Sequence, residues 1–374
     1  MKKLAVVCAS ELTIKAFLLG HLRALAQRYE VTVFADTADR ALLRRSGINV
    51  DIVNVPIARK IHPLRDLLAL IRLYRLLRTG RFDIVHSVTP KAGLIAMAAA
   101  RLAGVPCRVH TFTGQVWVTR SGLMRAILKL ADNTIAALTT HVLADSRSQI
   151  RFMVDQGVVR DEKATLLAEG SISGVDTERF KPDIRSRTRI RAELGIGAND
   201  IVFIYLGRLN RDKGLLDLCQ AFSRLGAANA HLLIVGPDEE GLASKMRALA
   251  IDRTHFVGPT AEPEAYYAAA DVFCLASYRE GFGTSVIEAA ASGLPAIGSR
   301  IYGVVDAIVE GNTGMLFAPG DSNELARLMQ RFIEQPNIIT TMGEQARRRA
   351  EGHFAAPILV QALLDFYRDL ELAC

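Results

Sequence analysis

Two glutamates stand on either side of a glycine-rich turn in the stretch YREGFGTSVIE, residues 278–288. Glu280 directly precedes the turn Gly281–Gly283, and Glu288 lies in the helix expected to follow it. Glycines let the backbone approach a ligand closely, and the first N–H groups of a helix attract an anion. We therefore expect a phosphate group at the start of this helix.

The two carboxylates beside this turn need a different partner from the phosphate. The two carboxylates cannot both bind the phosphate, because like charges repel each other unless a metal ion bridges them. An ionised carboxylate is a two-oxygen acceptor that suits the vicinal hydroxyls of a sugar. A nucleotide diphosphate-sugar has hydroxyls at both ends and phosphates between them, so the pattern predicts a nucleotide-sugar site. The alternative is that both acids lie on an exposed loop and helix face.

Two cations follow the first strand of the same half of the chain, in YLGRLNRDKG. Arg208 and Lys213 are expected at the carboxyl end of a parallel strand, where such folds bind ligands. An arginine can neutralise a diphosphate through paired hydrogen bonds, and a lysine can do so as a point charge. The alternative is a pair of solvated loop charges.

The elements that must position these residues are short, continuously apolar runs that alternate with helical patterns. This alternation predicts an α/β fold with doubly wound parallel sheets. The pattern stops near Pro182 and restarts, so we predict two Rossmann-like domains, residues 1–182 and 183–356. A last helix, 357–374, is expected to pack back on the first domain. The expected strands are 3–9, 29–35, 50–56, 82–88, 107–112 and 141–146, then 200–207, 230–236, 254–258, 271–277, 294–299 and 314–319.

The net charge of +7 conceals an asymmetry between the two halves. Residues 1–182 carry 27 Lys and Arg against 15 Asp and Glu, a net +12, whereas residues 183–374 carry 19 against 24, a net −5. A basic half indicates an anionic partner. Nucleic acid is a poor candidate, because no recognition motif accompanies the charge.

The segment Arg59–Arg81 concentrates this charge, with seven cations and one acid around the apolar run LLALIRLYRLL. A basic amphipathic helix of this kind favours an anionic membrane surface. The alternative is a helix that packs on the sheet and leaves a solvated basic face.

Cysteine use and apolar runs bear on location. Five cysteines without a CxxC pair argue against a disulfide framework or a zinc site and for a reducing compartment. The start, MKKLAVVCAS, is interpreted as a buried strand rather than a signal peptide. The longest apolar stretch elsewhere, Ala92–Ala100, is much shorter than the ~20 residues of a spanning helix. We expect a cytoplasmic protein that is peripheral on the inner face of the cytoplasmic membrane.

At these residues the chain resembles the GT4 family of retaining glycosyltransferases, which have the GT-B fold. The E-x7-E motif of the family corresponds to Glu280 and Glu288, and its diphosphate-binding pair to Arg208 and Lys213. The segments GVDTERFKP and GVVDAIVEGNTGMLFAPGD resemble further family segments in the same order, so the resemblance covers the whole chain.

The resemblance implies that the two domains face a central cleft, and it assigns roles to single residues. Glu280 and the backbone of the turn would hold the donor sugar, and Glu288 the ribose. His110, in VHTFTG, would face the donor, or alternatively it is a satisfied histidine at a strand end. The implied catalytic residues are His110, Arg208, Lys213 and Glu280, and the implied nucleotide-sugar ligands are Arg208, Lys213, Gly281, Phe282, Gly283, Thr284 and Glu288.

One departure from the family pattern lies after the first strand. The Gly-Gly loop that is usual there is replaced by ASELTIKAF. The acceptor and phosphate contacts of the first domain are therefore not carried over from the family.

The implied activity is a hexosyltransferase that moves a hexose or N-acetylhexosamine from a UDP-sugar. The acceptor would be a lipid-linked (polyprenyl-diphosphate) glycan, in the synthesis of capsule, O-antigen or a related surface polysaccharide. No D-x-D motif occurs, so we expect no metal ligands, no cofactor and metal-independent transfer. Retention of the anomeric configuration is implied by the resemblance alone.

Two alternatives of other classes stay open. One is a nucleotide-sugar 2-epimerase of the same fold, which would need no acceptor. The other is a non-catalytic two-domain binding protein. A dinucleotide-dependent reductase is disfavoured, because no GxGxxG follows either first strand.

Overall fold

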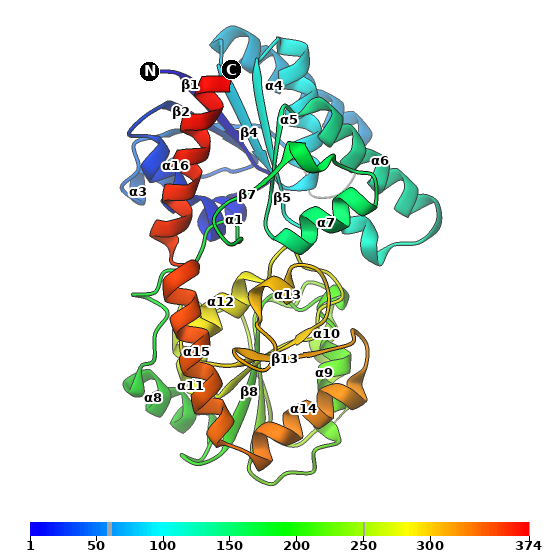
Figure 1. Cartoon of the computed structure of the whole chain (residues 1–374), viewed down its shortest axis with the longest axis vertical. Helices are drawn as coiled ribbons and strands as arrows, with labels where there is room; N and C mark the ends of the chain where they lie inside the picture. Colours follow the sequence, from blue (N-terminus) through cyan, green and yellow to red (C-terminus); the bar gives the residue numbers. More distant parts are fainter. Residues whose placement is uncertain (58–61, 250, 374) are drawn as a thin grey trace. The chain divides into compact units, whose positions relative to one another are not determined.

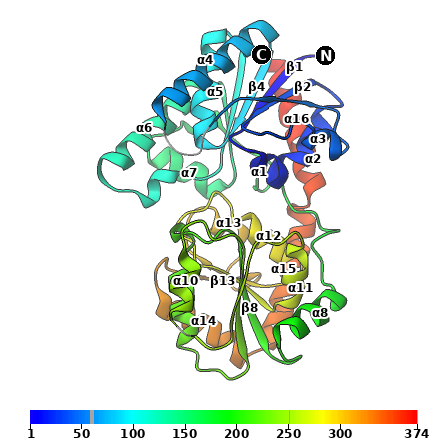
Figure 2. The same cartoon turned by 180° about the vertical axis from the view of Figure 1, so that it is seen from behind.

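The computed structural model describes residues 1–57, 62–249 and 251–373, and the chain divides into two compact units (Figures 1 and 2). Unit 1 comprises Met1–Ser173 and Ala356–Cys374, and unit 2 comprises Gly174–Ala355. The division lies before the expected boundary at 182/183. The reason is that Val175 and Phe180 are buried in the core of unit 2, which places the segment 174–182 in that unit.

Unit 1 is built on a parallel sheet of seven strands in the order β3-β2-β1-β4-β5-β6-β7. Its inner strands are short and buried on both faces, as continuously apolar runs require, whereas the edge strands β3 and β7 are partly exposed. Their bounds are β1 Lys3–Val7, β2 Glu30–Ala35, β3 Asp51–Asn54, β4 Ile84–Val88, β5 Cys107–Phe112, β6 His141–Ala144 and β7 Ala164–Leu166.

Helices cover both faces of this sheet, and each face has its own apolar core. One core includes side chains of η1, α2, α3 and α16, and the other includes side chains of α4, α5, α6 and α7. The bounds are α1 Glu11–Thr13, η1 Ile14–Leu18, α2 Leu19–Leu25, α3 Leu42–Arg45, α4 Pro63–Gly80, α5 Pro90–Ala103, η2 Val116–Thr119, α6 Gly122–Leu138, α7 Arg147–Asp155, η3 Asp161–Lys163 and α16 Ala356–Ala373.

The last helix, α16, contributes to the first of these two cores although it follows unit 2 in sequence (Figure 1, red). It packs against α2, and Leu359, Leu363 and Tyr367 are buried in the interface. The Tyr367 hydroxyl also lies 2.8 Å from Nδ1 of the buried His86 in β4. The apolar core of unit 1 therefore includes a helix, α16, that follows unit 2 in the sequence.

Unit 2 has a parallel sheet of six strands in the order β10-β9-β8-β11-β12-β13. The strands are β8 Ile201–Leu206, β9 Ala230–Val235, β10 Thr254–Val257, β11 Val272–Leu275, β12 Ala296–Ser299 and β13 Gly314–Phe317. The helices are α8 Ile184–Leu194, η4 Arg211–Lys213, α9 Leu215–Ser223, α10 Leu242–Arg247, α11 Pro263–Ala269, α12 Thr284–Ala291, α13 Val304–Ala307, α14 Ser322–Glu334 and α15 Asn337–His353.

Several helix ends follow from local sequence. Helices α4 and α5 begin with a proline, whose missing N–H has no partner to lose in the first turn. The Asp183 side chain caps α8 by accepting from the Arg185 backbone N–H, and Gly195 ends that helix in the left-handed conformation.

The predicted fold class, two doubly wound parallel sheets of Rossmann type, is confirmed. The expected strands correspond to β1–β6 and β8–β13, whereas the three-residue β7 was not predicted. Among the described residues, no helix combines the length and apolarity that membrane spanning requires.

The cysteine expectation is corrected at one position. Cys8, Cys219 and Cys274 are free and buried. Cys107, in β5, is disulfide-bonded. The expectation of no disulfide therefore has one exception among the described residues, at Cys107, and the reducing compartment stays a prediction.

Candidate active site

The candidate site lies at the carboxyl ends of β8 and β11 in unit 2. These strands are hydrogen-bonded neighbours, although a crossover through β9 and β10 separates them in sequence. Strand order reverses direction between them, and such a switch point is where doubly wound sheets bind ligands. The loop that carries Arg208 and Lys213 follows β8, and the loop that carries Glu280 follows β11, so the topology brings both predicted loops to one place.

Lys213 and Glu280 form an ion pair between these loops. The Lys213 ammonium donates to Glu280 Oε1 at 2.5 Å, and the Ser277 hydroxyl donates to the same oxygen at 2.7 Å. Both charged side chains are largely buried, with 19% of Lys213 and 13% of Glu280 exposed. The pair fixes the direction of the Glu280 carboxylate, which keeps lone pairs for further donors such as sugar hydroxyls.

Arg208 stands at the exit of β8 and is more exposed. Its guanidinium donates to Glu239 Oε2 at 3.0 Å, and its backbone carbonyl accepts from the Tyr205 hydroxyl at 2.8 Å. Charged hydrogen bonds thus hold both predicted phosphate-binding cations. A bound diphosphate would either displace Glu239 from Arg208 or share Arg208 with it.

The loops around this pair approach each other backbone to backbone. Gly214 has a φ of +62°, and a Cβ there would lie 2.0 Å from the Ala276 carbonyl oxygen. The Tyr278 backbone N–H donates to the Asp212 carbonyl at 2.8 Å. Only glycine fits at position 214, so this glycine sets the spacing of the two site loops.

The predicted phosphate-binding turn leads directly into α12. Gly283 precedes the helix with a φ of +90° and has no side chain to cap it. The N-terminus of α12 is therefore suited to an anion through its N–H groups and its dipole. Thr284 is the first residue of the helix, and Gly303 packs on the turn so closely that a Cβ there would lie 2.5 Å from the Gly281 carbonyl oxygen.

Phe282 has a structural role within this turn. Its side chain is 2% exposed and lies against Phe354, with 5.1 Å between the ring centroids. Only the backbone of Phe282 is left to contact a ligand, and its ring anchors the turn to the core of unit 2.

Glu288, the second glutamate of the motif, is half-buried on α12. Its Oε2 accepts from the Tyr267 hydroxyl of α11 at 3.1 Å. Burial raises the pKa of Glu288 to about 7, while the Tyr267 hydrogen bond acts in the opposite direction. The carboxyl is thus poised between its neutral and ionised forms near neutral pH.

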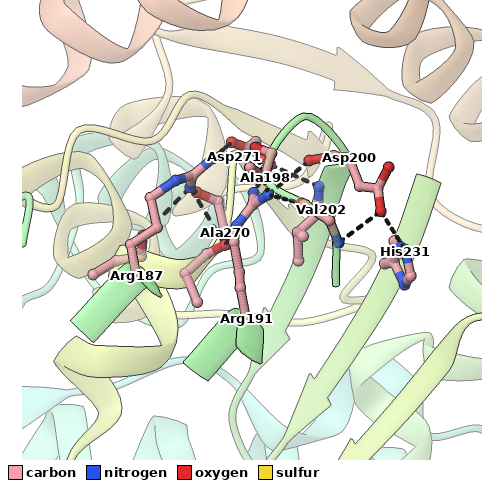
Figure 3. Close-up of polar contacts among 11 residues, drawn as sticks. Arg187, Arg191, Ala198, Asp200, Val202, His231, Ala270 and Asp271 are labelled. Carbon is pink, nitrogen blue, oxygen red and sulfur yellow. Dashed lines mark hydrogen bonds and ion pairs between the residues drawn. The ribbon is translucent and has the colours of Figure 1, made fainter. Parts of the chain in front are cut away.

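The amino ends of β8 and β11, opposite the candidate site, are held by an arginine clamp in which Arg191 is buried and Arg187 and Asp271 are partly buried (Figure 3). Arg187 and Arg191 of α8 donate to the two oxygens of Asp271 at 2.7 and 2.6 Å. The Val202 backbone N–H donates to Asp271 at 2.7 Å. The clamp ties the starts of the two strands whose other ends carry the site.

His110 lies in unit 1, whereas the other predicted site residues lie in unit 2. Its side chain is fully buried, and α5 passes so close that a Cβ at Gly93 would lie 2.3 Å from the ring. Nδ1 lies 2.8 Å from the Ser87 hydroxyl, and Nε2 has no hydrogen-bond partner among the residues that the structure describes. Burial lowers the pKa of His110 to about 3, so the imidazole is neutral at physiological pH.

This placement bears on the predicted role of His110. The ring packs against Ser87, Gly93 and Phe112 of unit 1, and the expectation that it faces the donor stays untested. His110 is not the satisfied histidine of the alternative, because one buried nitrogen lacks a partner. A catalytic role for His110 stays a prediction.

Sequence reasoning missed three residues that contact the predicted ones. Ser277 precedes Glu280 by three residues, and a hydroxyl at the end of a strand was a readable signal. Glu239, in GPDEEG, follows β9, and its strand neighbours β8, so its position at the same edge could be inferred. Tyr267 carries no such signal, because only the packing of α11 beside α12 brings it to Glu288.

Metal-ligand clusters were also sought among the residues that the structure describes. Within residues 1–57, 62–249 and 251–373, no three His, Cys, Asp or Glu side chains are grouped so that they could hold a metal ion.

Comparison with protein families supports the enzymatic interpretation. Residues 186–349 match the family described as glycosyl transferases group 1, and residues 14–170 match the glycosyl transferase 4-like domain. The two matches cover most of both units. The chain is a glycosyltransferase, with a glycosyl transferase 4-like domain followed by a group 1 domain.

Curated relatives of this glycosyltransferase are similar over most of their length. The chain is 29% identical to the capsular polysaccharide biosynthesis glycosyltransferase CapM of Staphylococcus aureus, over 84% of this chain and 83% of that protein. It is 28% identical to the UDP-Gal:alpha-D-GlcNAc-diphosphoundecaprenol alpha-1,3-galactosyltransferase of Escherichia coli, over 84% and 82% of the two chains.

Solved structures show the same fold. HepE of Anabaena, in complex with UDP and glucose, has a TM-score of 0.83 and 20% identity, with 99% of this chain and 100% of that chain covered. WaaG, a glycosyltransferase involved in lipopolysaccharide biosynthesis, has a TM-score of 0.72 and 18% identity, over 96% and 98% of the two chains. The GT-B fold implied by the sequence is therefore confirmed, and the family favours a transferase over the 2-epimerase and the binding protein.

Proposed function

We propose that this glycosyltransferase moves a hexose or N-acetylhexosamine from a UDP-sugar to a lipid-linked, polyprenyl-diphosphate glycan in surface polysaccharide synthesis. The observation that carries the proposal is the convergence of Arg208, the Lys213–Glu280 pair and the α12 N-terminus at the switch point of unit 2. Cations and helix N–H groups there match a diphosphate, and a directed carboxylate matches sugar hydroxyls. The name of the E. coli relative supports a lipid-linked acceptor, and the name of the S. aureus relative supports a role in polysaccharide synthesis.

The reaction in this proposal breaks the bond between the anomeric carbon and the diphosphate oxygen and forms a bond from that carbon to an acceptor hydroxyl oxygen. The acceptor proton passes to the departing diphosphate. Arg208, Lys213 and the α12 N-terminus stabilise the charge of the leaving group, and such preorganised donors commonly supply the largest catalytic contribution. Attack on the face from which the diphosphate departs retains the anomeric configuration, and no metal ion takes part.

The location in this proposal is peripheral, on the inner face of the cytoplasmic membrane, where a polyprenyl-linked acceptor would be reached. The basic balance of residues 1–182 supports contact with anionic lipid. Of the predicted basic segment Arg59–Arg81, the residues before position 62 lie outside the described residues, and the remainder forms α4.

The first test is thermal stability with UDP, GDP and ADP, each with and without EDTA. UDP at 100 times its dissociation constant should stabilise unit 2 by ~2.7 kcal/mol, and EDTA should leave the shift unchanged. Arg208→Ala should abolish the shift, whereas Arg211→Ala should keep it, because Arg211 lies on the same loop with 76% of its side chain exposed.

Two outcomes would overturn parts of the proposal. No shift with any nucleotide would remove the diphosphate site at α12. An EDTA-sensitive shift would contradict metal independence. Retention is tested separately by NMR of the product, and inversion at the anomeric carbon would refute it.

A further inference from the structure

Exposed apolar side chains gather on one face of unit 1. More than half of the large apolar side chains that are exposed among the described residues lie on α4, α5 and α6. On α4 they are Leu64, Leu67, Leu68 and Ile71, and on α6 they are Leu123, Met124, Ile127 and Leu130. We call these eight side chains the α4/α6 patch.

Both halves of the patch are regular stripes rather than scattered residues. On α4 the other members lie three, four and seven residues after Leu64, and on α6 they lie one, four and seven residues after Leu123. Each set therefore lies along one side of its helix. A different stripe of α4, Ala69, Leu73 and Leu77, is the one buried against the sheet. The exposed stripe of α4 is therefore a second apolar face that the fold of unit 1 does not cover.

Helix α6 adds an end that stands clear of the core. Residues 121–127 are all exposed, whereas Ile135 and Ala136 near its other end are buried. Apolar side chains on such a free helix end are costly in water unless another surface covers them. Asp132, farther along the helix, is buried and accepts from the Trp117 indole at 2.8 Å. Burial raises its pKa to about 7, so it places no exposed negative charge beside the free end of the helix.

The charges around the patch are almost all positive. Helices α4, α5 and α6 together carry eight Lys and Arg and two acids, Asp66 and Asp132. Asp66 is neutralised by Lys91 at 2.7 Å. A surface of apolar stripes flanked by unopposed arginines is complementary to an anionic lipid interface, where each cation contributes about 1 kcal/mol.

Topology places the patch at a particular end of the sheet. Helix α4 follows the carboxyl end of β3 and α6 follows that of β5, so both begin at the carboxyl edge of the unit 1 sheet. The patch members lie in the first half of each helix, next to that edge. α5 packs between α4 and α6 on the same face, as both views show (Figures 1 and 2).

We infer that the α4/α6 patch inserts into the interface of an anionic lipid bilayer and holds the carboxyl edge of the unit 1 sheet at the membrane. This inference deepens the proposed function, because it names the surface that would bring the enzyme to a lipid-linked acceptor. Helix α6 supplies half of the attachment, and no sequence pattern had indicated it.

The test is flotation of the full-length protein with vesicles of phosphatidylcholine alone or mixed with phosphatidylglycerol. Wild type should bind the anionic vesicles and bind phosphatidylcholine much less. Leu123→Gln/Ile127→Gln should bind at least about tenfold more weakly, because two side chains leave the apolar interface. The matched control is Ile184→Gln/Leu249→Gln, which alters two side chains of unit 2 that are 73% and 50% exposed.

Several results would overturn the inference: no binding of wild type to anionic vesicles, equal binding of the α6 variant, or equal loss in the control. Self-association of wild type that the α6 variant abolishes, without vesicle binding, would assign the patch to a second copy instead. The UDP-induced thermal shift is measured on the same samples. A normal shift without vesicle binding refutes only this inference, whereas vesicle binding without any shift refutes only the proposed donor site.

Discussion

At the scale of single residues, the candidate site is a set of charges that already hold one another. Arg208 is bonded to Glu239 and Lys213 to Glu280, so a diphosphate enters a site of paired charges rather than one of free cations. Glu288 differs from Glu280, because its hydrogen bond comes from a neutral tyrosine and its surroundings raise its pKa. The two glutamates of one motif therefore have different partners, a cation for Glu280 and a neutral hydroxyl for Glu288.

Substitution of Glu288 tests this difference through the pH dependence of stability. Its folded pKa of about 7 exceeds the ordinary 4.5, so between these values the folded state binds more protons than the unfolded state. Stability therefore falls as pH rises from 4.5 to 7. Glu288→Gln removes this dependence. From pH 4.5 to 7, the free energy of unfolding of the variant should therefore rise by about 2 kcal/mol relative to that of wild type.

Urea unfolding of both proteins at pH 4.5, 5.5, 6.5 and 7.5 measures the effect. The difference between the two proteins isolates Glu288, because all other groups titrate alike in both. A difference that does not change with pH would mean that the pKa of Glu288 is the same in the folded and unfolded states.

At the scale of elements, the site depends on two neighbouring strands fixed at both ends. The arginine clamp on Asp271 holds their starts, and the close contact of Gly214 with Ala276 sets the distance between the loops at their ends. Neither contact includes a residue that was predicted to bind a ligand.

Removal of the clamp carboxylate should be strongly destabilising. Asp271→Ala leaves Arg187 and Arg191 without their acid, and loss of one partner of a buried ion pair costs about 3–5 kcal/mol. Glu262→Ala is the control, because it breaks an exposed ion pair of the same helix, Arg189–Glu262, and should cost at most about 1 kcal/mol. Urea unfolding measures both, and equal costs would show that the clamp is not a buried pair in solution.

Gly214 offers a second test at this scale, with a matched glycine. Gly214 and Gly226 have φ values of +62° and +57°, but a Cβ at Gly226 would meet nothing within 4 Å. Gly214→Ala and Gly226→Ala therefore share the backbone strain, and only the first forces the site loops apart. We expect Gly214→Ala to be about 1–3 kcal/mol less stable than Gly226→Ala and to lose most of the UDP-induced shift.

The thermal-shift assay with UDP, together with urea unfolding, compares the two glycine variants. Equal stability and equal UDP shifts would show that the two loops tolerate a side chain between them.

At the scale of the whole molecule, the chain leaves unit 1 for unit 2 and returns to complete unit 1. Three core positions of α16, Leu359, Leu363 and Tyr367, lie in the same cluster as strands β1 and β2. The stability of unit 1 therefore depends on residues that follow unit 2 in the sequence.

A substitution in α16 should act on unit 1 alone. Leu363 is 3% exposed, so Leu363→Ala should destabilise unit 1 by about 2–5 kcal/mol. Leu372→Ala, on the same helix with 85% of the side chain exposed, should change stability by less than about 0.5 kcal/mol. Hydrogen exchange should show faster exchange in residues 1–173 of the Leu363 variant and unchanged rates in residues 174–355. Faster exchange in unit 2 would contradict the division.

The sequence by itself determined what each local pattern can specify. Continuous apolar runs indicated parallel strands, their alternation with helices indicated doubly wound sheets, and the motif residues marked the two site loops. These features depend on neighbours in the chain, so periodicity and turn chemistry reveal them.

Only the tertiary structure decided which groups meet across the chain. It paired Lys213 with Glu280 and Glu288 with Tyr267, buried His110 beneath α5, and left one side of α4 and the free end of α6 uncovered. The physical reason is that burial and pairing depend on distances between segments far apart in sequence. Strand order sets those distances, and no local pattern records them.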